Sequence, residues 1–159
     1  ERIFQLLTQV SGRAGRAEKK GKVILQTRVP RHPCLQTTLE QDYKSFAKYT
    51  LKTRQMLNYP PFARILRIIC KSENEKLPFP ILLKLRDQIE KLITSQNLSC
   101  TILGPTPCCI AKLQKYWRCH LLIKSPQPTI LSQIINNFST EKIPTKTMLL
   151  FDLDPQDLL

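Results

Sequence analysis

The residues from Gln9 to Arg16 are the part of this sequence best suited to chemistry. Arg13 and Arg16 lie three residues apart, and a glycine, Gly12 or Gly15, directly precedes each of them. Two guanidinium groups with little side-chain bulk beside them can point at one target, and their planar N–H forks match the geometry of a phosphate. The pattern therefore predicts a phosphate contact. The alternative is a basic loop that touches only solvent or a nucleic-acid backbone.

The elements on either side must position this stretch. Apolar side chains recur at helical spacing from Ile3 to Val10, so we expect a helix over residues 1–10. Residues 22–27 are rich in β-branched and apolar side chains, which predicts a strand. One helix and one strand cannot bury both of their apolar surfaces. We therefore interpret residues 1–31 as the end of a domain, and the chain as a fragment of a longer protein.

Basic side chains dominate the charge. The 159 residues include 25 Lys and Arg against 12 Asp and Glu, a formal net charge of +13. Residues 1–76 hold 16 basic and 6 acidic residues, or +10, and residues 77–159 hold 9 and 6, or +3. Such a field favours a polyanion as partner without choosing between DNA, RNA and an anionic membrane. No apolar run reaches the ~18 residues that span a bilayer, so we expect a soluble, cytoplasmic protein.

A single long helix is predicted over residues 34–56, within a connecting segment that we place at residues 32–58. Lys44, Lys48 and Lys52 recur every four residues and would form a positive row along one side of this helix. The row is a candidate contact with a DNA backbone. The alternative is an ordinary solvent-facing side.

Strand and helix periods alternate along the rest of the chain in the order βαββαβ. The expected strands cover residues 63–71, 100–103, 117–124 and 147–153, and the expected helices cover residues 80–96 and 129–138. This order is typical of a split βαβ, ferredoxin-like sandwich, with two helices on one face of a sheet. Residues 104–115 are rich in proline and are expected to form an irregular connection. The predicted fold class is α+β, with residues 59–159 as a C-terminal domain.

Basic and aromatic side chains mix around the third expected strand. The DNA-binding candidates there are Lys112, Lys115, Trp117, Arg118 and Lys124. They combine positive charge with an aromatic face on which a base can stack. The alternative is that Trp117 belongs to the core and the lysines form a solvated rim.

The spacing of cysteines and carboxylates predicts no metal site. The six cysteines form no C-x-x-C pair, so we expect thiols that pack as small apolar groups. Asp152 and Asp154 would share a face of the last strand, but no third ligand is close in sequence, so strand-end turn chemistry is expected. The sequence also lacks a G-x-x-x-x-G-K-[ST] loop and an acidic metal-holding box. The chain alone is therefore not expected to hydrolyse ATP.

The pattern Q-x-x-G-R-x-G-R over residues 9–16 resembles the sixth conserved motif of superfamily 2 helicases, in the second of their two RecA-like lobes. Further motifs follow in order along the chain: His32-Pro33, Tyr59-Pro60-Pro61-Phe62, Leu103-Gly104-Pro105, the run from Trp117 to Lys124, and Asp152-x-Asp154-Pro155. Together these motifs resemble the primosomal protein N-prime family of bacterial replication-restart helicases, over essentially the whole chain.

The resemblance implies the C-terminal part of an ATP-dependent 3′-to-5′ DNA helicase that recognises and remodels stalled replication forks and starts primosome assembly. In the family, the arginines of the motif reach across a cleft to ATP on the other lobe. Arg13 and Arg16 are thus the catalytic candidates, and Gln9, Gly12 and Gly15 would line the ATP cleft. ATP, Mg²⁺ and a zinc-binding insertion belong to upstream parts of the family's proteins. None of them is expected to bind this fragment alone.

The resemblance also implies forked or branched DNA, primosome proteins and single-stranded DNA-binding protein as partners of a nucleoid-associated monomer. In the family, the pocket for single-stranded DNA-binding protein uses an arginine and a glutamine near the start of the last helix, where this chain has Pro128 and Ser132. The family's final domain is similar to a small ribosomal-protein fold. The alternative function is a non-enzymatic, basic nucleic-acid-binding module in which residues 12–16 form only a basic loop.

Overall fold

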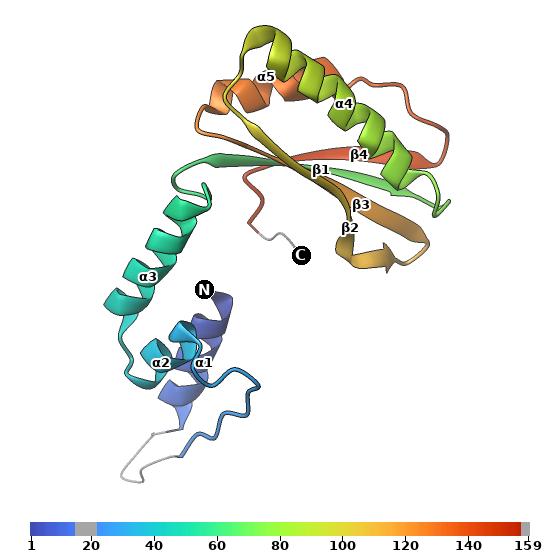
Figure 1. Cartoon of the computed structure of the whole chain (residues 1–159). Helices are drawn as coiled ribbons and strands as arrows, with labels where there is room; N and C mark the ends of the chain where they lie inside the picture. The colour runs from blue at the N-terminus through green and yellow to red at the C-terminus, as the bar shows by residue number, and fades with distance from the viewer. Residues whose placement is uncertain (15–21, 157–159) are drawn as a thin grey trace. The chain divides into compact units, whose positions relative to one another are not determined.

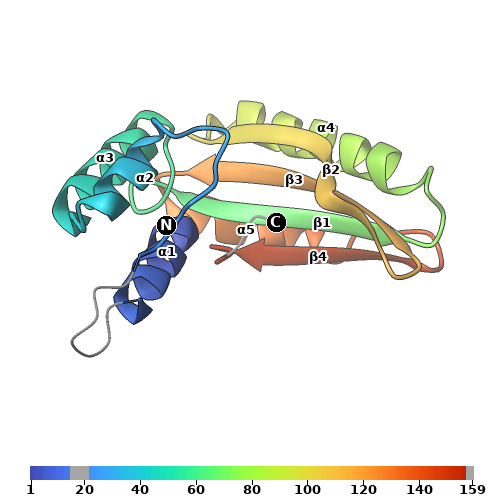
Figure 2. The same cartoon turned by 90° about the horizontal axis from the view of Figure 1, so that it is seen from below.

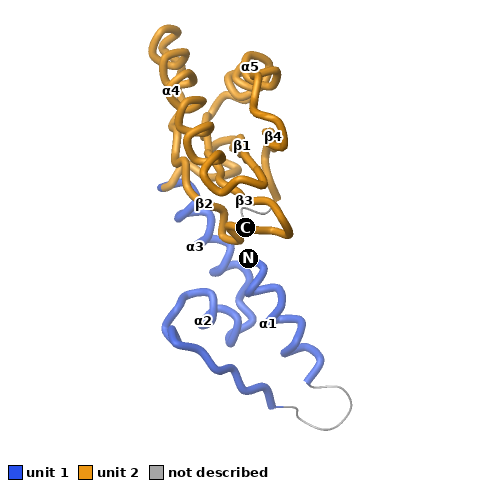
Figure 3. Tube along the Cα trace, turned by 90° about the vertical axis from the view of Figure 1, so that its right-hand side faces the viewer, with its two compact units in different colours: residues 1–56 blue, residues 57–159 orange. Residues whose placement is uncertain are grey.

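The computed structural model describes residues 1–14 and 22–156, and the chain divides into two compact units (Figure 3). Unit 1 covers residues 1–56 and is helical, whereas unit 2 covers residues 57–159 and combines helices with an antiparallel sheet (Figure 1). The predicted α+β class is confirmed. Within the described ranges, no helix has both the length and the apolarity needed to cross a membrane.

Three helices form unit 1. They are α1 (Arg2–Arg13), α2 (Pro33–Leu39) and α3 (Tyr43–Met56). The core of the unit is small: the ring of Phe4 stacks on that of Phe46 with 4.3 Å between centroids, and Cys34 is buried beside them. Arg54, near the end of α3, pairs at 2.9 Å with Glu1, the residue before α1. This ion pair links α3 to the start of α1 at the surface.

The prediction of one long helix over residues 34–56 is wrong, because the chain breaks between α2 and α3. Gln41 has a left-handed backbone with φ 54°. The N–H of Asp42 donates to the carbonyl of Thr37 at 2.9 Å, which closes the end of α2 in a Schellman-type turn. The side chain of Asp42 then accepts from the N–H of Ser45 at 3.0 Å and caps the start of α3.

The predicted strand over residues 22–27 is also wrong. These residues form irregular backbone, and their apolar side chains are exposed, most of all Ile24. A strand needs a neighbour to satisfy its backbone groups, and no described segment pairs with this one. The β-branched composition alone is therefore not enough to form a strand.

Unit 2 holds four strands and two helices in the predicted order. They are β1 (Arg64–Ser72), α4 (Pro78–Gln96), β2 (Thr101–Leu113), β3 (Tyr116–Ser125), α5 (Pro128–Phe138) and β4 (Thr147–Leu153). The sheet has the order β2-β3-β1-β4, and every neighbouring pair is antiparallel. Figures 1 and 2 show α4 and α5 on the same face of this sheet. We call the other face the open face.

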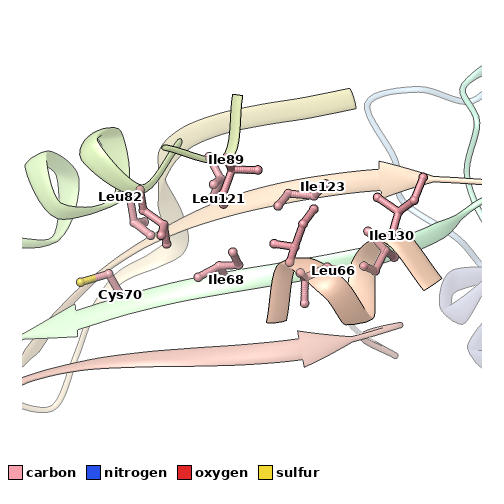
Figure 4. Packing of buried hydrophobic residues seen from close by; sticks show 11 residues of the cluster. Leu66, Ile68, Cys70, Leu82, Ile89, Leu121, Ile123 and Ile130 are labelled. Atoms are coloured by element: carbon pink, nitrogen blue, oxygen red, sulfur yellow. The ribbon is translucent and has the colours of Figure 1, made fainter. Parts of the chain in front are cut away.

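The core of unit 2 lies between the sheet and its two helices (Figure 4). Alternate residues of β1 point into it, namely Leu66, Ile68 and Cys70, because side chains along a strand alternate between faces. Leu82 and Ile89 of α4, two turns apart, meet them from the helix layer. Each fully buried aliphatic side chain of this kind contributes about 1.5–3 kcal/mol to folding.

The prediction of an irregular connection over residues 104–115 is wrong, since β2 runs through most of it. The strand absorbs its prolines through two shifts of register, after Leu103 and after Pro107. Gly104 has φ 99°, and a Cβ there would lie 3.0 Å from the carbonyl oxygen of His120. Prolines are tolerated because β2 is an edge strand, where outward N–H groups need no partner in the sheet.

Candidate phosphate and nucleic-acid contact sites

The helicase-like motif begins inside α1 and occupies its exposed C-terminal turn. Gln9 and Arg13 are one turn apart, so they lie on the same side of the helix as Gly12. All three are exposed. A Cβ added to Gly12 would meet nothing within 4 Å, so no described part of the chain requires a glycine there. Gly15 and Arg16, the other half of the predicted site, lie outside the described residues.

The surface formed by Gln9, Gly12 and Arg13 suits an anionic ligand that approaches from outside. Arg13 belongs to the last turn of α1 and is exposed. The bare backbone at Gly12 leaves room for a ligand or a facing protein surface next to it. These residues supply hydrogen-bond donors and one positive charge. They supply no carboxylate to hold a metal ion.

The predicted lysine row forms on α3. Lys44, Lys48 and Lys52 all lie within this helix and are exposed. Successive members rise about 6 Å along the helix axis, so the row presents evenly spaced positive charges. None of the ion pairs in the described part of the chain involves them.

A second basic surface lies at one end of the sheet in unit 2. We call it the basic sheet end. Its basic members are Lys71, Lys112, Lys115, Arg118 and Lys146, and its aromatic members are Tyr116 and Trp117. Strand register brings them to the same end of the sheet, on both of its faces: Lys71 of β1 is paired with Arg118 of β3 on the open face, and Lys112 of β2 is paired with Trp117 on the face that carries the helices.

Cation–π contacts organise this surface. Lys112 Nζ lies 4.9 Å from the centroid of the Trp117 ring. Two ammonium groups approach Tyr116, with Lys71 Nζ at 5.6 Å and Lys115 Nζ at 5.3 Å from its centroid. Each such contact is worth ~0.5–1 kcal/mol at an exposed site. The ammonium groups of these lysines thus lie against aromatic rings and still add positive charge to the surface.

Glu73 neutralises part of the charge of the basic sheet end. Its carboxylate lies 2.6 Å from Lys115 Nζ and 3.8 Å from Lys146 Nζ. The hydrogen bond from Lys115 is the main reason that the pKa of Glu73 is lowered, and the pKa of Lys115 is raised by the same bond. Lys71, Lys112 and Arg118 have no carboxylate in the described ion pairs, so they are the cations most available to an anion.

Lys124 lies apart from the other predicted DNA-binding residues. It is six residues beyond Arg118 on β3, about 20 Å along the strand. Its ammonium donates to the carbonyl of Leu57 at 2.8 Å and lies 4.8 Å from the centroid of the Tyr59 ring. These contacts fasten the entry segment of unit 2 to the sheet.

The sequence analysis missed Lys71 and Lys146 as members of the basic sheet end. Lys71 is far from Lys112 in sequence and joins it only through the pairing of β1 with β3. Lys146 follows α5 and reaches the same end because β4 lies beside β1. An assignment of strand order and register would have been the signal, since these decide which residues lie at the same end of the sheet.

Asp152 in β4 and Asp154 just after it pair with arginines. Asp152 lies 3.0 Å from Arg67, its register partner on β1, and Asp154 pairs with Arg64. The Arg64 hydrogen bond lowers the pKa of Asp154. Among the described residues, no group of three or more His, Cys, Asp or Glu side chains is placed to hold a metal ion.

The geometry defines a basic α+β protein with two exposed lysine-rich surfaces that suit a polyanion. Residues 55–156 match the family model of the primosomal protein N C-terminal domain. The chain therefore belongs to this family.

Proteins named replication restart protein PriA are similar over nearly the whole chain. The relative from Synechocystis is 37% identical over 98% of this chain, that from Haemophilus influenzae 35% over 99%, and that from Treponema pallidum 33% over 100%. The matched regions make up 18%, 22% and 24% of these relatives. The chain thus spans about a fifth of the length of the curated relatives it matches.

Proposed function

We propose that this chain forms the C-terminal part of an ATP-dependent 3′-to-5′ DNA helicase that acts in replication restart. The observation that carries the proposal is the similarity to proteins named replication restart protein PriA along 98–100% of the chain. In this role the protein recognises and remodels stalled forks and starts primosome assembly. Forked or branched DNA is the proposed substrate, and primosome proteins and single-stranded DNA-binding protein are proposed partners.

Arg13 and Arg16 are the proposed catalytic residues. As the γ-phosphoryl group leaves ATP, negative charge builds up on its oxygens and on the bridging oxygen. A guanidinium already positioned there stabilises the transition state more than the ground state. The exposed Arg13 and the bare backbone at Gly12 support this role, because both face outward from α1 and can meet a nucleotide held on another lobe.

ATP and Mg²⁺ would be held mainly by other parts of the protein. Gln9 and Arg13 can donate hydrogen bonds to phosphate oxygens, but this stretch has no carboxylate ligand for Mg²⁺ and no phosphate-binding glycine loop. We place zinc in an upstream insertion of the proposed parent. The protein would act in the cytoplasm, in association with the nucleoid.

Residues 1–31 are proposed to complete a RecA-like lobe. Unit 1 leaves many large apolar side chains exposed, including Ile3, Leu6 and Val10 on α1. An apolar groove of about 450 Å³, lined in part by Leu7, Leu25 and Phe46, lies within the unit. Such surfaces are expected where further parts of a lobe pack.

Unit 2 is proposed to have a ferredoxin-like arrangement, similar to a small ribosomal-protein fold. Its element order, its strand order and the placement of both helices on one face support this assignment. The basic sheet end is the proposed DNA contact of this unit. Pro128 begins α5 and Ser132 bonds back to its carbonyl at 3.3 Å, so a pocket for single-stranded DNA-binding protein here would need other polar side chains.

The catalytic role of Arg13 can be tested in the full-length helicase that the proposal implies. Arg13→Ala should lower DNA-stimulated ATP hydrolysis by about 10³-fold or more, the typical contribution of an arginine finger. The affinity for forked DNA should stay the same, because the substitution removes charge from the ATP cleft and not from a DNA contact. Arg31→Ala, an exposed arginine outside the motif, is the matched control and should keep both properties.

Two outcomes would contradict this proposal. Equal loss of DNA binding and ATP hydrolysis in Arg13→Ala would favour the non-enzymatic nucleic-acid-binding module. Magnesium-dependent ATP hydrolysis by the purified 159-residue chain would show that the catalytic apparatus is organised differently from the proposal.

A further inference from the structure

Three turns meet at the basic sheet end of unit 2 (Figure 2). Glu73 follows β1, Lys115 lies in the hairpin turn between β2 and β3, and Lys146 directly precedes β4. Because β1 lies between β3 and β4 in the sheet, a carboxylate at its end can reach both lysines. Oε1 of Glu73 is 2.6 Å from Lys115 Nζ, and Oε2 is 3.8 Å from Lys146 Nζ. Each carboxylate oxygen thus faces a different cation.

Hydrogen bonds hold the backbone around this carboxylate in place. The buried hydroxyl of Ser72 accepts from the Thr147 hydroxyl at 3.1 Å and from the N–H of Asn74 at 3.2 Å. Ser72 and Asn74 are the two chain neighbours of Glu73, and Thr147 follows Lys146 directly. The turn that carries the carboxylate is therefore tied to the start of β4.

The Glu73 carboxylate occupies a place that also suits a phosphate. A phosphodiester of a DNA backbone is likewise an anion with two free oxygens, and each oxygen can accept a charge-assisted hydrogen bond from an ammonium group. The side chains of Lys115 and Lys146 are 65% and 72% exposed, whereas that of Glu73 is 32% exposed. A phosphate that arrives from solvent can therefore reach both ammonium groups.

An aromatic ring lies beside this place. Lys115 Nζ is 5.3 Å from the centroid of the Tyr116 ring, and Lys71 Nζ is 5.6 Å from the same centroid. A phosphate at Lys115 would thus lie next to a second cation and to a ring on which a base can stack. This combination favours a nucleic acid over a simple anion as the ligand.

We propose that Lys115 and Lys146 form a site for one phosphate of a DNA backbone, and that Glu73 competes with this phosphate and so limits the affinity of unit 2 for DNA. The inference deepens the proposed DNA contact at the basic sheet end and rests on it. Without DNA, Glu73 neutralises both lysines. When a phosphate binds, the carboxylate gives up its two ammonium contacts and turns toward solvent, and this loss opposes binding.

The competition can be tested by titrating the 159-residue chain into fluorescently labelled duplex DNA over a range of salt concentrations. Glu73→Gln keeps the size of the side chain and removes its charge, so both ammonium groups become available to a phosphate. Binding should become about threefold to tenfold tighter at about 0.1 M salt. The slope of log affinity against log salt should steepen by about 0.9, the contribution of one further phosphate contact.

Glu75→Gln is the matched control, because it removes the same charge two residues away. Glu75 is exposed and takes part in none of the ion pairs found among residues 1–14 and 22–156. Salt screens an exposed charge that touches no cation of the site, so this substitution should change the affinity by less than about twofold.

A double-mutant cycle separates competition from a general effect of charge. Lys115→Gln should change the affinity little in the unmodified chain, because Glu73 already neutralises this lysine. In the Glu73→Gln background the same substitution should weaken binding by about threefold or more and return the salt slope toward its original value. Circular dichroism of all four chains should show the same folded signal.

Two results would overturn the inference and leave the DNA contact in place. One is an equal effect of Glu73→Gln and Glu75→Gln, and the other is additivity of Glu73→Gln and Lys115→Gln. In both cases weaker binding by Lys71→Ala would show that the basic sheet end still contacts DNA. If Lys71→Ala, Lys115→Gln and Glu73→Gln all left the DNA affinity unchanged, the proposed DNA contact would be wrong and this inference would fall with it.

Discussion

His120 and Cys108 form an uncharged pair on the open face of the sheet. Nδ1 of His120 lies 3.4 Å from the Cys108 sulfur, and Nε2 lies 3.4 Å from the Thr106 hydroxyl. Burial lowers the pKa of His120, and the positive charges of Arg67 and Arg118 lower it further. Burial also raises the pKa of the Cys108 thiol. At neutral pH the pair is therefore a thiol and a neutral imidazole, which suits packing better than nucleophilic chemistry.

The stability of unit 2 should fall as the pH drops through the range in which His120 titrates. A histidine whose pKa is lowered by folding binds protons more readily when unfolded, so it stabilises the fold above its unfolded pKa of about 6.5 and loses that contribution as the pH falls through the folded value. Urea unfolding followed by fluorescence of Trp117, the one tryptophan of the chain, should give a lower midpoint at about pH 5.5 than at about pH 7.5. His120→Gln should reduce this difference. An unchanged difference in the variant would assign the effect to other groups.

At the scale of elements, sequence period predicted the regular parts of unit 2. The helices α4 and α5 and the strands β1, β3 and β4 begin and end within two residues of their expected bounds. In each of these elements, the spacing of apolar residues in the sequence matches the spacing of the side chains that face the core. The pattern failed where tertiary pairing decides the structure, as in β2, whose prolines are tolerated only because it is an edge strand. The prediction for residues 22–27 failed for the converse reason. Their composition is typical of a strand, but no described strand pairs with them.

The residues of the candidate sites also divide into those that local sequence spacing predicts and those that depend on strand pairing. Lys44, Lys48 and Lys52 could be found from the sequence because helical spacing is local. Lys71 and Lys146 could not, because their place at the basic sheet end depends on which strands are neighbours and in what register. The break before α3 was missed because its left-handed residue is a glutamine, where a glycine would have marked the end of a helix.

Replacing Gln41 should strengthen the junction between α2 and α3. Gln41 has φ 54°, a conformation that costs an L residue about 1 kcal/mol and glycine much less. Gln41→Gly should therefore raise the stability of unit 1 by about 0.5–1 kcal/mol. Thermal unfolding followed by the helical circular dichroism signal measures this. Gln5→Gly, inside α1 and exposed, is the matched control and should destabilise by a similar amount. Destabilisation by both substitutions would show that the left-handed turn does not form.

On the scale of the whole molecule, each unit carries its own basic surface. Unit 1 presents the lysine row of α3, and unit 2 presents the basic sheet end. The two surfaces differ in kind. The row consists of unrestrained lysines on a helix, whereas Lys71 and Lys112 are held against Tyr116 and Trp117. The first suits sequence-independent contact with phosphates, and the second can add base stacking.

Salt dependence can separate the two surfaces in DNA binding by the 159-residue chain. Each phosphate contact contributes about 0.9 to the slope of log affinity against log salt for duplex DNA and about 0.7 for single strands. Replacing Lys44, Lys48 and Lys52 together by alanine should therefore reduce the slope by about 2–3. A second triple variant, with alanine at Lys71, Lys112 and Arg118, should reduce it by a similar amount.

Base stacking gives the two variants different signatures. Loss of Lys112 frees Trp117 from its cation–π contact, so the second variant should also change the fluorescence quenching of Trp117 by single-stranded DNA. The helix variant should leave that quenching unchanged at saturating DNA. A third variant, with alanine at Lys84, Lys91 and Lys142, removes the same charge from exposed positions outside both surfaces. If it lowered the slope as much as the other two, the net charge of the chain would account for binding, and neither surface would be a site.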